Sequence, residues 1–500
     1  MNMVTIEIDG RSLQVEPGTT VLKAAEAIGI VIPRFCFHPA FEPEGSCRMC
    51  LVEIEGLPKL DLACATVVRE GMKVRTATPR VVEARKDVLE FLLADHPLDC
   101  PICDKAGECF LQDYYDKHGR YASRFFESKE KKKKKIAIGK GLLLDRERCV
   151  LCTRCVRFLR RVTGTGELGV FERGVKAEIG IDEGRDIRNN YSGNLVDICP
   201  VGAITDRDFR FKTRVWFLEK GRTVCPRCGR GCSIVVQSVR GYPLVGNERR
   251  IYRIVAAENP AVNGHWICDF GRCGQHDIED DRLTAIAVND GGRSAGLQEG
   301  RPADWNAVLK ALAGEIRTLG EAGRGTRLAV ILNSFLTDEE LGMCRKLFVD
   351  ILGVKDIFLV DPKPGEADGL LLTADRAPNV RGAAVLGLGP KPPDAARLGE
   401  SADMLLIFGS HLLDHLSPEQ AAAALGGVRR KWLFTAHRSA LDRLVDVVLP
   451  TAVPAEKKGS FTNVDGITQS FACAVRPRKG CLPEAEILAR LAAELGVKLE

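Results

Sequence analysis

The chain has 500 residues, a hydrophobic content of 45% and a formal net charge of +5, values typical of a multidomain globular protein. A net charge this small does not indicate a nucleic-acid-binding protein. No apolar run reaches the roughly 18 residues of a membrane span, and the N-terminus has no signal-peptide pattern, so we expect a cytoplasmic protein. Nineteen cysteines in a reducing compartment predict metal binding, and fifteen of them precede residue 269 in spaced groups.

Residues 1–78 are predicted to form a small ferredoxin-type domain. Alternating apolar residues predict a hairpin over 4–15, and a helix is predicted over 20–27. The ligand candidates follow with the spacing C-x10-C-x2-C-x13-C: Cys36, Cys47, Cys50 and Cys64. This order resembles the β-grasp of plant-type [2Fe-2S] ferredoxins, with the longer first gap of their respiratory and hydrogenase relatives. The alternative is a four-cysteine zinc site, although such sites prefer two C-x2-4-C knuckles and only one is present.

Residues 79–215 contain two further ligand sets. Helical spacing of apolar residues over 81–93 predicts a helix that leads into the pattern H-x3-C-x2-C-x5-C: His96, Cys100, Cys103 and Cys109. Alone, this set fits either a structural zinc or a [4Fe-4S] cluster. The second set has the C-x2-C-x2-C and distant Cys-Pro pattern of bacterial ferredoxins: Cys149, Cys152, Cys155 and Cys199.

Because ferredoxin clusters often occur in pairs, we predict a [4Fe-4S] cluster at both sets. A neutral histidine ligand should raise the reduction potential of its cluster. The alternative for His96 is a supporting role behind the ligands.

Two other patterns in this region are predicted to carry no cofactor chemistry. The lysine-rich run 129–135 is predicted to be a solvated loop, with a docking role as the less favoured alternative. Residues 164–169 match the dinucleotide fingerprint G-x-G-x-x-G, but no buried strand precedes them. We therefore predict a turn there and no NAD site.

Residues 216–275 are predicted to form a third iron–sulfur region. Its candidates have the spacing C-x2-C-x3-C with a distant fourth member: Cys225, Cys228, Cys232 and Cys268. Gly229, Gly231 and Gly241 allow close approach of the backbone to a cluster. The spacing, together with Gly246-Asn247 and residues 261–264, resembles the N-terminal [4Fe-4S] domain of molybdopterin oxidoreductases such as formate dehydrogenase. Zinc is the alternative metal, and Cys273 is predicted to be a spare thiol.

Residues 276–500 are predicted to form a doubly wound parallel α/β domain. Short apolar runs at 328–332, 357–360, 404–408 and 432–434 predict buried strands, and helical segments separate them, one of them beginning after Thr337. Residues 459–466 resemble a segment that molybdopterin enzymes keep near their cofactor. The domain is nevertheless short for such an enzyme, and Phe270 stands where those enzymes often carry lysine. Cys344, Cys473 and Cys481 are predicted to be core thiols in a helix, a strand and a loop, so we expect no molybdopterin.

The four sets in this order, followed by a degenerate pterin-enzyme domain, resemble the large iron–sulfur subunit of respiratory complex I. The resemblance implies a multidomain α+β and α/β protein with one [2Fe-2S] and three [4Fe-4S] clusters. It implies electron relay from an NADH-binding flavoprotein subunit toward quinone, with a small [2Fe-2S] subunit and quinone-module subunits as further partners. It also implies a peripheral position on the cytoplasmic side of the bacterial inner membrane. The alternatives are an electron-transfer subunit of a soluble NAD-linked hydrogenase and a formate dehydrogenase.

Overall fold

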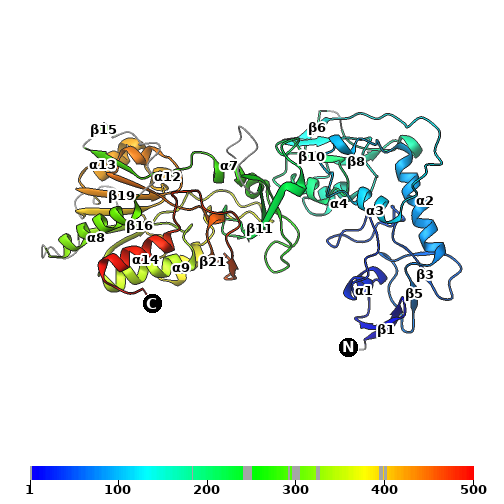
Figure 1. Cartoon of the computed structure of the whole chain (residues 1–500), viewed down its shortest axis with the longest axis horizontal. Coiled ribbons are helices and arrows are strands. Elements are labelled where there is room, and N and C mark those ends of the chain that lie inside the picture. The colour runs from blue at the N-terminus through cyan, green and yellow to red at the C-terminus, as the bar shows by residue number, and fades with distance from the viewer. Residues whose placement is uncertain are drawn as a thin grey trace. The chain divides into compact units, whose positions relative to one another are not determined.

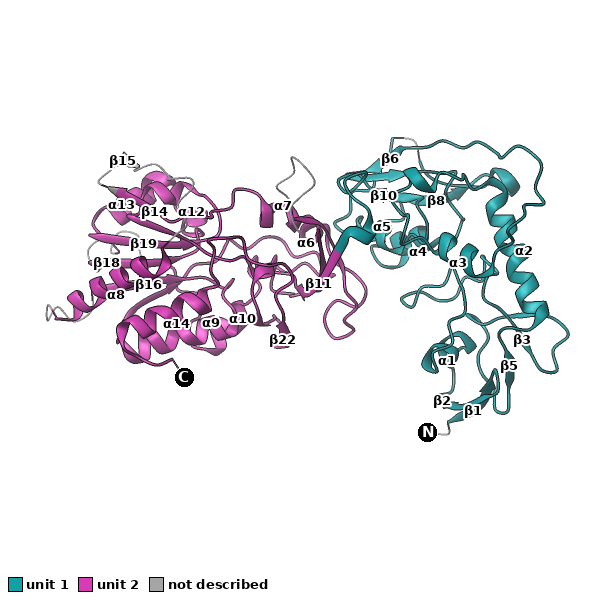
Figure 2. Ribbon diagram, viewed as in Figure 1, with its two compact units in different colours: residues 1–218 teal, residues 219–500 magenta. Residues whose placement is uncertain are grey.

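The computed structural model describes residues 3–182, 184–239, 250–290, 293–294, 304–321, 327–393, 398 and 402–499. The chain divides into two compact units, residues 1–218 and residues 219–500 (Figures 1 and 2). Gly241 and Gly246-Asn247 lie outside the described residues. None of the described helices is both long and apolar enough to cross a membrane.

The first part of unit 1 is a five-stranded sheet of order β2-β1-β5-β3-β4. The predicted hairpin forms two of its strands, and the predicted helix follows them in the chain. Its elements are β1 (Val4–Ile8), β2 (Arg11–Val15), α1 (Val21–Ala27), β3 (Leu51–Ile54), β4 (Asp61–Leu62) and β5 (Lys73–Arg75). Thr20 caps α1 by accepting a hydrogen bond from the Lys23 amide, as Thr does at helix N-termini. Apolar side chains of α1 and of the alternate strand positions form the core of this sheet.

The remainder of unit 1 surrounds the next two ligand sets with short elements. They are α2 (Pro79–Asp95), α3 (Phe110–His118), β6 (Ile136–Gly139), β7 (Leu142–Leu144), α4 (Arg154–Arg161), β8 (Leu168–Phe171), β9 (Glu178–Ile181), α5 (Asn194–Ile198) and β10 (Ile204–Asp206). The helix predicted over 81–93 is confirmed as α2. Of the turn predicted over 164–169, residues 164–167 form an irregular connection between α4 and β8, whereas residues 168 and 169 already belong to β8.

Unit 2 begins with an antiparallel sheet of order β11-β12-β13, next to two short helices and a hairpin. These elements are β11 (Leu218–Val224), β12 (Ser233–Val239), β13 (Ile251–Ala256), α6 (Asp269–Arg272), α7 (Gly274–Glu279), β21 (Gly459–Thr462) and β22 (Thr468–Phe471). The predicted segment 459–466 therefore forms β21 and the turn that follows it.

The rest of unit 2 is a seven-stranded sheet of order β15-β14-β20-β19-β18-β16-β17 with helices around it. Its strands are β14 (Ala287–Asp290), β15 (Arg293–Ser294), β16 (Leu328–Leu332), β17 (Asp356–Leu359), β18 (Met404–Phe408), β19 (Arg430–Thr435) and β20 (Val447–Pro450). Its helices are α8 (Trp305–Glu321), α9 (Asp338–Cys344), α10 (Val380–Val385), α12 (Leu412–His415), α13 (Pro418–Gly426) and α14 (Glu484–Leu495).

The prediction of a parallel sheet is correct for five of these strands and wrong at one edge. Strands β17, β16, β18, β19 and β20 pair in parallel, and the four predicted strands are all present. However, β14 pairs antiparallel with both β20 and β15, because the chain enters this edge without a crossover helix. Thr337 and Glu340 form a capping box at the start of α9, where the helix was predicted to begin.

Candidate metal centres

The first ligand set lies in the loops beside the five-stranded sheet. The Cys36 and Cys47 side chains contact one another, and Cys50 contacts Cys64. The hydrogen bond with Cys47 lowers the pKa of Cys36 to about 5, whereas the same bond, together with burial, raises the pKa of Cys47. Arg48, between two candidate ligands, has a φ of 55°, a left-handed conformation that bends the loop sharply. The four predicted ligands are thus gathered at one place.

The second set begins at the C-terminal end of α2, where His96 is the C-cap residue. Burial, together with the charge of Arg148, lowers the pKa of His96 to about 4, so the imidazole is neutral, the form that binds metals. Its Nδ1 atom is buried without a hydrogen-bond partner. A cavity of about 680 Å³ is lined by His96, Cys100 and Cys109. A neutral imidazole with a buried, unpaired nitrogen fits a metal ligand.

The third set forms the wall of one small, apolar cavity, which Cys149, Cys152, Cys155 and Cys199 line together. Leu151 and Thr153, the residues on either side of Cys152, have φ values of 50° and 58°. A non-glycine residue is strained in this left-handed conformation, and such strain concentrates at functional sites. Burial raises the pKa of Cys152 to about 11 and also raises the pKa of Cys155 well above its usual value. Metal binding would displace these thiol protons.

The second and third sets share structural elements. Gly202, three residues after Cys199, packs so closely on Cys103 that a Cβ atom there would overlap the Cys103 sulfur. The Lys105 ammonium donates to the Val196 carbonyl at 3.1 Å. Arg148 and Asp99, each adjacent to a candidate ligand, form a two-pronged ion pair with Nη2–Oδ2 and Nε–Oδ1 distances of 2.7 and 3.2 Å. The two sets are therefore built on a common framework.

The lysine-rich run 129–135 forms a largely exposed loop, as predicted, but three of its lysines also bind neighbouring segments. Lys129 donates to the Leu93 and Ala94 carbonyls at the end of α2, where a cation is favoured by the helix dipole. Lys132 donates to the Ala177 carbonyl at 2.7 Å. Lys134 forms ion pairs with Asp99 and Glu147 at 3.1 and 2.7 Å. The run thus connects the His96 loop to the strands that follow.

The fourth set lies in unit 2, in the connection between β11 and β12 and at the start of α6. The charges of Cys228 and Cys268 act on Cys225, which shows that these side chains are near one another, and Cys232 interacts with all three. Burial raises the pKa of Cys268 to about 11. A Cβ atom at Gly271 would stand 3.0 Å from the Cys225 sulfur, so glycine is required for this approach. The predicted set is again gathered at one place.

Phe270, at the position where lysine is frequent in molybdopterin enzymes, is held between two cations. The guanidinium carbons of Arg227 and Arg376 lie 3.9 and 5.4 Å from its ring centroid. The aromatic ring therefore has a structural role of its own at this position.

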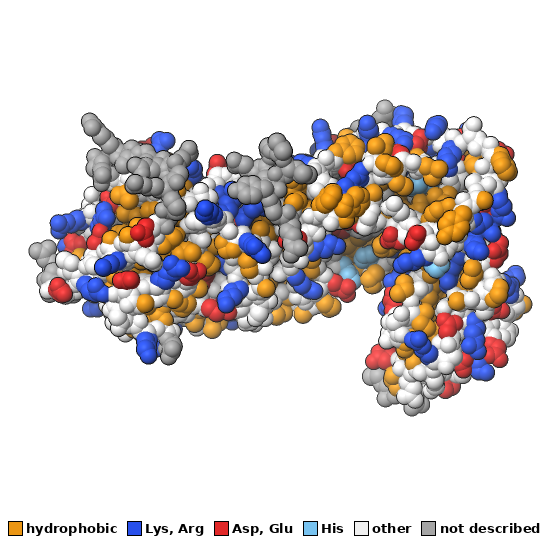
Figure 3. Space-filling model, in the orientation of Figure 1, with side chains coloured by type: hydrophobic (Ala, Val, Ile, Leu, Met, Phe, Trp, Pro, Cys, Tyr) orange, Lys and Arg blue, Asp and Glu red, His pale blue; other side chains and the backbone are white. Residues whose placement is uncertain are grey.

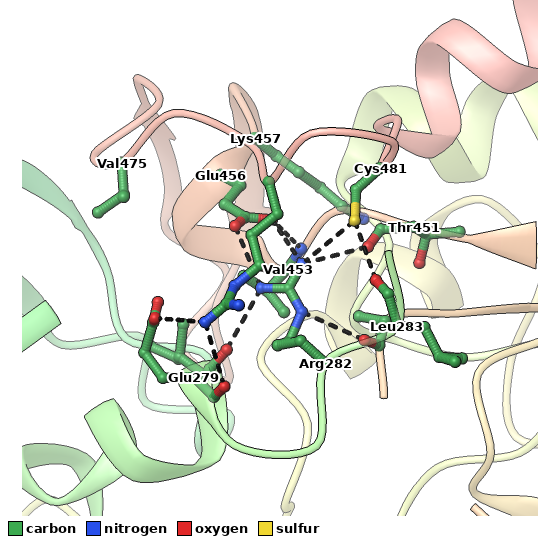
Figure 4. Close-up of polar contacts among 12 residues, drawn as sticks. Glu279, Arg282, Leu283, Thr451, Val453, Glu456, Lys457, Val475 and Cys481 are labelled. Atoms are coloured by element: carbon green, nitrogen blue, oxygen red, sulfur yellow. Dashed lines mark hydrogen bonds and ion pairs between the residues drawn. The ribbon is translucent and has the colours of Figure 1, made fainter. Parts of the chain in front are cut away.

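The remaining thiols are only partly as predicted. Cys344 is buried in α9, and Cys481 is buried where its thiol donates to the Leu283 carbonyl at 3.1 Å (Figure 4). Cys473 is exposed and follows the end of β22, so the prediction of a core thiol in a strand is wrong for it. Across the described residues, no three His, Cys, Asp or Glu side chains stand close enough to hold one metal ion, so the members of each set are neighbours that do not converge on a single point. In an iron–sulfur cluster the ligands are shared among several irons, so such convergence is not needed.

Three family models match successive parts of the chain. A 2Fe-2S iron–sulfur cluster binding domain matches residues 1–79. An iron–sulfur binding region of NADH-ubiquinone oxidoreductase-G matches residues 85–124, and the ferredoxin-like domain of NADH-quinone oxidoreductase subunit 3 matches residues 139–205. These matches cover the first three ligand sets and confirm ferredoxin-like iron–sulfur domains in unit 1.

Curated relatives agree with these models. The chain is 42% identical to the NADH-quinone oxidoreductase G subunit of Streptomyces coelicolor over 335 residues, which are 66% of this chain and 38% of that protein. It is 34% identical over 434 residues to the mitochondrial 78 kDa subunit of NADH-ubiquinone oxidoreductase from Neurospora crassa, covering 86% of this chain and 53% of that protein. The chain belongs to the family of the large iron–sulfur subunit of complex I. The resemblance drawn from the ligand spacing is thereby confirmed.

The matched relatives are longer than this chain. The chain spans about half the length or less of the curated relatives it matches, including 43% of the NADH-quinone oxidoreductase G subunit of Mycobacterium bovis, to which it is 40% identical over 71% of its own length. One chain of a solved NAD+-reducing [NiFe]-hydrogenase is 32% identical and aligns over 42% of this chain and 91% of that chain. Its TM-score is 0.38, which does not establish a shared fold.

Proposed function

We propose that the chain is an iron–sulfur electron-transfer subunit of an NADH–quinone oxidoreductase complex. The observation that carries this proposal is the presence of four ligand sets, each gathered at one place, three of them inside regions matched by iron–sulfur family models. Iron–sulfur clusters bound at these sets supply one-electron transfer. The role of the chain is to hold them at fixed positions, exclude water and set their potentials.

We assign each set to one cluster. The [2Fe-2S] ligands are Cys36, Cys47, Cys50 and Cys64 in domain 1–78. Domain 79–215 supplies His96, Cys100, Cys103 and Cys109 for one [4Fe-4S] cluster and Cys149, Cys152, Cys155 and Cys199 for another. Domain 216–275 supplies Cys225, Cys228, Cys232 and Cys268 for the third. The buried, neutral His96 and the jointly lined cavity of the Cys149 set support these assignments.

We assign residues 276–500 to a scaffold related to molybdopterin oxidoreductases. In doubly wound sheets, ligands bind outside the carboxyl ends of the strands where the strand order reverses, which here lies between β16 and β18. At that point the Asn333 amide donates to the Phe408 carbonyl at 2.6 Å, and Phe335 stacks on His411 with centroids 4.9 Å apart. The chain's own side chains thus contact one another at the switch point, which supports a structural role.

The proposed partners follow from the same family. They are an NADH-oxidising flavoprotein subunit, a small [2Fe-2S] subunit and the quinone-module subunits. The complex would hold the chain at the cytoplasmic side of a bacterial inner membrane. On the face shown in Figure 3, basic and acidic side chains are intermixed over both units, so partner contacts need not depend on one strongly charged patch.

Metal analysis of the anaerobically purified chain tests the proposal. We expect about 14 irons per chain from one [2Fe-2S] and three [4Fe-4S] clusters. The cells should be supplied with molybdate and tungstate. Zinc in place of iron would refute the corresponding cluster, and stoichiometric molybdenum or tungsten with formate-dependent dye reduction would refute the scaffold assignment.

Substituting the proposed histidine ligand tests the most unusual set. The His96→Ala variant should lose or convert one [4Fe-4S] electron paramagnetic resonance (EPR) signal and keep the [2Fe-2S] signal, because His96 lies in a different set from Cys36. His437→Ala, at a half-buried histidine of unit 2, is the matched control and should change neither signal. An unchanged spectrum of the His96→Ala variant would exclude the histidine as a ligand.

A further inference from the structure

Two buried arginines on α4 join the first and third ligand sets. Arg154 and Arg157 are each only 6% exposed, and they lie one residue before and two residues after Cys155. Arg154 donates to the Ile198 carbonyl at 3.2 Å, next to the candidate ligand Cys199. Its other terminal nitrogen donates to the Phe37 carbonyl, next to Cys36. One guanidinium thus contacts the backbone of both sets.

Arg157 makes the same kind of bridge. It donates to the Cys36 carbonyl and, at 3.4 Å, to the Cys152 carbonyl, so it contacts one candidate ligand residue from each set. A further bond of 3.1 Å to the Glu42 carbonyl fixes the loop that follows Cys36. The bonded groups on the first loop lie 121 and 115 positions before Arg157, so this bridge depends entirely on tertiary structure.

The charges of these arginines are poorly balanced by carboxylates. In the described part of the chain, Arg154 has no Asp or Glu among its bonded partners, and Arg157 has only the half-exposed Glu44 at 3.7 Å. Aromatic faces contribute instead: Phe110 lies 5.6 Å from Arg154 and Phe41 lies 5.2 Å from Arg157. The Nε atoms of both arginines are buried without a hydrogen-bond partner.

Burying an unpaired cation is costly, so a nearby negative charge is required. Four of the carbonyls that the two arginines bind belong to the candidate ligands Cys36 and Cys152 or to residues next to Cys36 and Cys199. The two candidate sets are therefore the nearest source of such a charge. Four thiolates around an iron–sulfur cluster leave a net negative charge, which would supply what the arginines lack.

We propose that Arg154 and Arg157 are positioning residues shared by the Cys36 and Cys149 clusters, and that their charges raise the reduction potentials of both clusters together. This inference rests on the cluster assignment above. Reduction adds one electron to a site, while the guanidinium keeps its proton throughout. A fixed positive charge next to both sites therefore favours the reduced form of each.

Redox titration followed by EPR spectroscopy of the intact, iron-loaded chain tests this inference. Arg154→Gln and Arg157→Gln remove the charge and keep hydrogen-bonding capacity. Each should weaken reduction of the [2Fe-2S] cluster and of the Cys149-set cluster about tenfold, a shift of about 59 mV for a one-electron couple. Arg154→Lys and Arg157→Lys keep the charge and should retain potentials close to those of the unmodified chain.

Two matched controls separate a shared charge from a general effect of substitution. Arg161→Gln removes an arginine from the same helix whose side chain is 50% exposed and paired with Glu42, and it should shift neither potential. Arg85 on α2 is buried and donates to the carbonyl of Leu51, the residue after the candidate ligand Cys50, at 3.3 Å. Arg85→Gln should shift the [2Fe-2S] potential alone.

The outcomes distinguish this inference from the cluster assignment itself. If the unmodified chain lacks iron at either set, the assignment fails before the arginines are tested. If the iron content is complete but the Gln variants shift neither potential, or only one, the shared-charge inference is refuted. Loss of iron in the Gln and Lys variants alike would show a purely geometric role and would also refute it. Loss of iron in the Gln variants only, with the reduction potentials of both clusters preserved in the Lys variants, supports the shared-charge inference.

Discussion

Buried positive charge is balanced differently in the α/β domain of unit 2 and on helix α4 of unit 1. In unit 2, the Arg282 guanidinium is almost completely buried and binds both oxygens of Glu456 at 3.1 and 2.8 Å (Figure 4). Lys457 is likewise buried and paired with Glu340 at 3.1 Å and with Glu484. In unit 1, Arg154 is buried against carbonyls and an aromatic ring, without a described carboxylate partner.

This difference shows which of the two regions has its buried cations balanced without a cofactor. The buried cations of the unit 2 α/β domain have carboxylate partners supplied by the chain itself. Unit 1 leaves cations beside thiols whose protons a metal would displace. Hence the cofactors of unit 1 are expected to contribute directly to its stability, in addition to their redox role.

The largest predicted effect follows from removal of iron. Anaerobic chelation should expose the amides of α4 and of the loops around Cys36 and Cys149, because Arg154 and Arg157 then lose their counter-charge. Strands β16, β18 and β19 should remain protected. Hydrogen exchange measured before and after chelation checks this contrast. Equal protection of both regions after iron removal would contradict it.

The second prediction concerns the buried ion pair between Arg282 and Glu456 in unit 2. Arg282→Met should destabilise the chain by about 3 kcal/mol, because Glu456 stays buried and loses one of its two cations. Arg250, whose Nη2 atom lies 2.6 Å from Glu456 Oε1, remains as the other. The double variant Arg282→Met/Glu456→Gln should recover part of this loss, since both charges are then removed. Denaturant unfolding of the iron-loaded proteins measures the difference. The iron content should stay unchanged in both variants.

The third prediction concerns the contact between the two sets of domain 79–215. Gly202→Ala should cost about 1–3 kcal/mol, because the new methyl group overlaps the Cys103 sulfur in a packed region. It should also perturb the EPR signals of both [4Fe-4S] clusters in this domain. Gly314→Ala in α8 is the control and should leave both signals unchanged, because a Cβ atom there meets no other atom within 4 Å. A change confined to one cluster would show that the two sites are independent.

The smallest expected effect is a pH dependence of stability that arises from Glu456 in unit 2. Burial alone would raise the pKa of Glu456, but the bonds and charges of Arg282 and Arg250 outweigh it and lower the pKa. The folded state therefore binds a proton less readily than the unfolded state. This group stabilises the fold above about pH 4.5, and the contribution is lost as the pH falls further. Thermal unfolding from about pH 6 to about pH 3 should show a slope below about pH 4.5 that the Glu456→Gln variant loses.

Local patterns in the sequence were sufficient for much of the architecture. The hairpin and helix of the first domain, α2 and the capped start of α9 follow from periodicity and from Thr at the N-cap. The ligand sets could be grouped because cluster ligands recur at short, characteristic spacings. Most of these signals involve residues that are close together in the sequence, the range over which local propensity acts.

What could not be predicted depends on contacts between distant segments. The bonds from Arg157 to the first loop connect residues 121 and 115 positions apart, and no local pattern distinguishes this buried arginine from the exposed Arg161 of the same helix. The run 129–135 has the composition of a solvated loop, and only the structure shows that Lys129, Lys132 and Lys134 bind other segments. The antiparallel edge strand β14 likewise depends on where the chain re-enters the sheet.

The segment from Cys199 to Gly202 also determines when two of the ligand sets become complete during synthesis. Cys149, Cys152 and Cys155 leave the ribosome well before Cys199, which is the last proposed ligand of their set. At about 5–20 residues per second, the roughly 44 intervening positions impose a delay of about 2–9 s. During that time the His96 set also lacks the backbone of Gly202 that packs on Cys103. The nascent thiols therefore require a reducing environment or a chaperone until this segment has been synthesised.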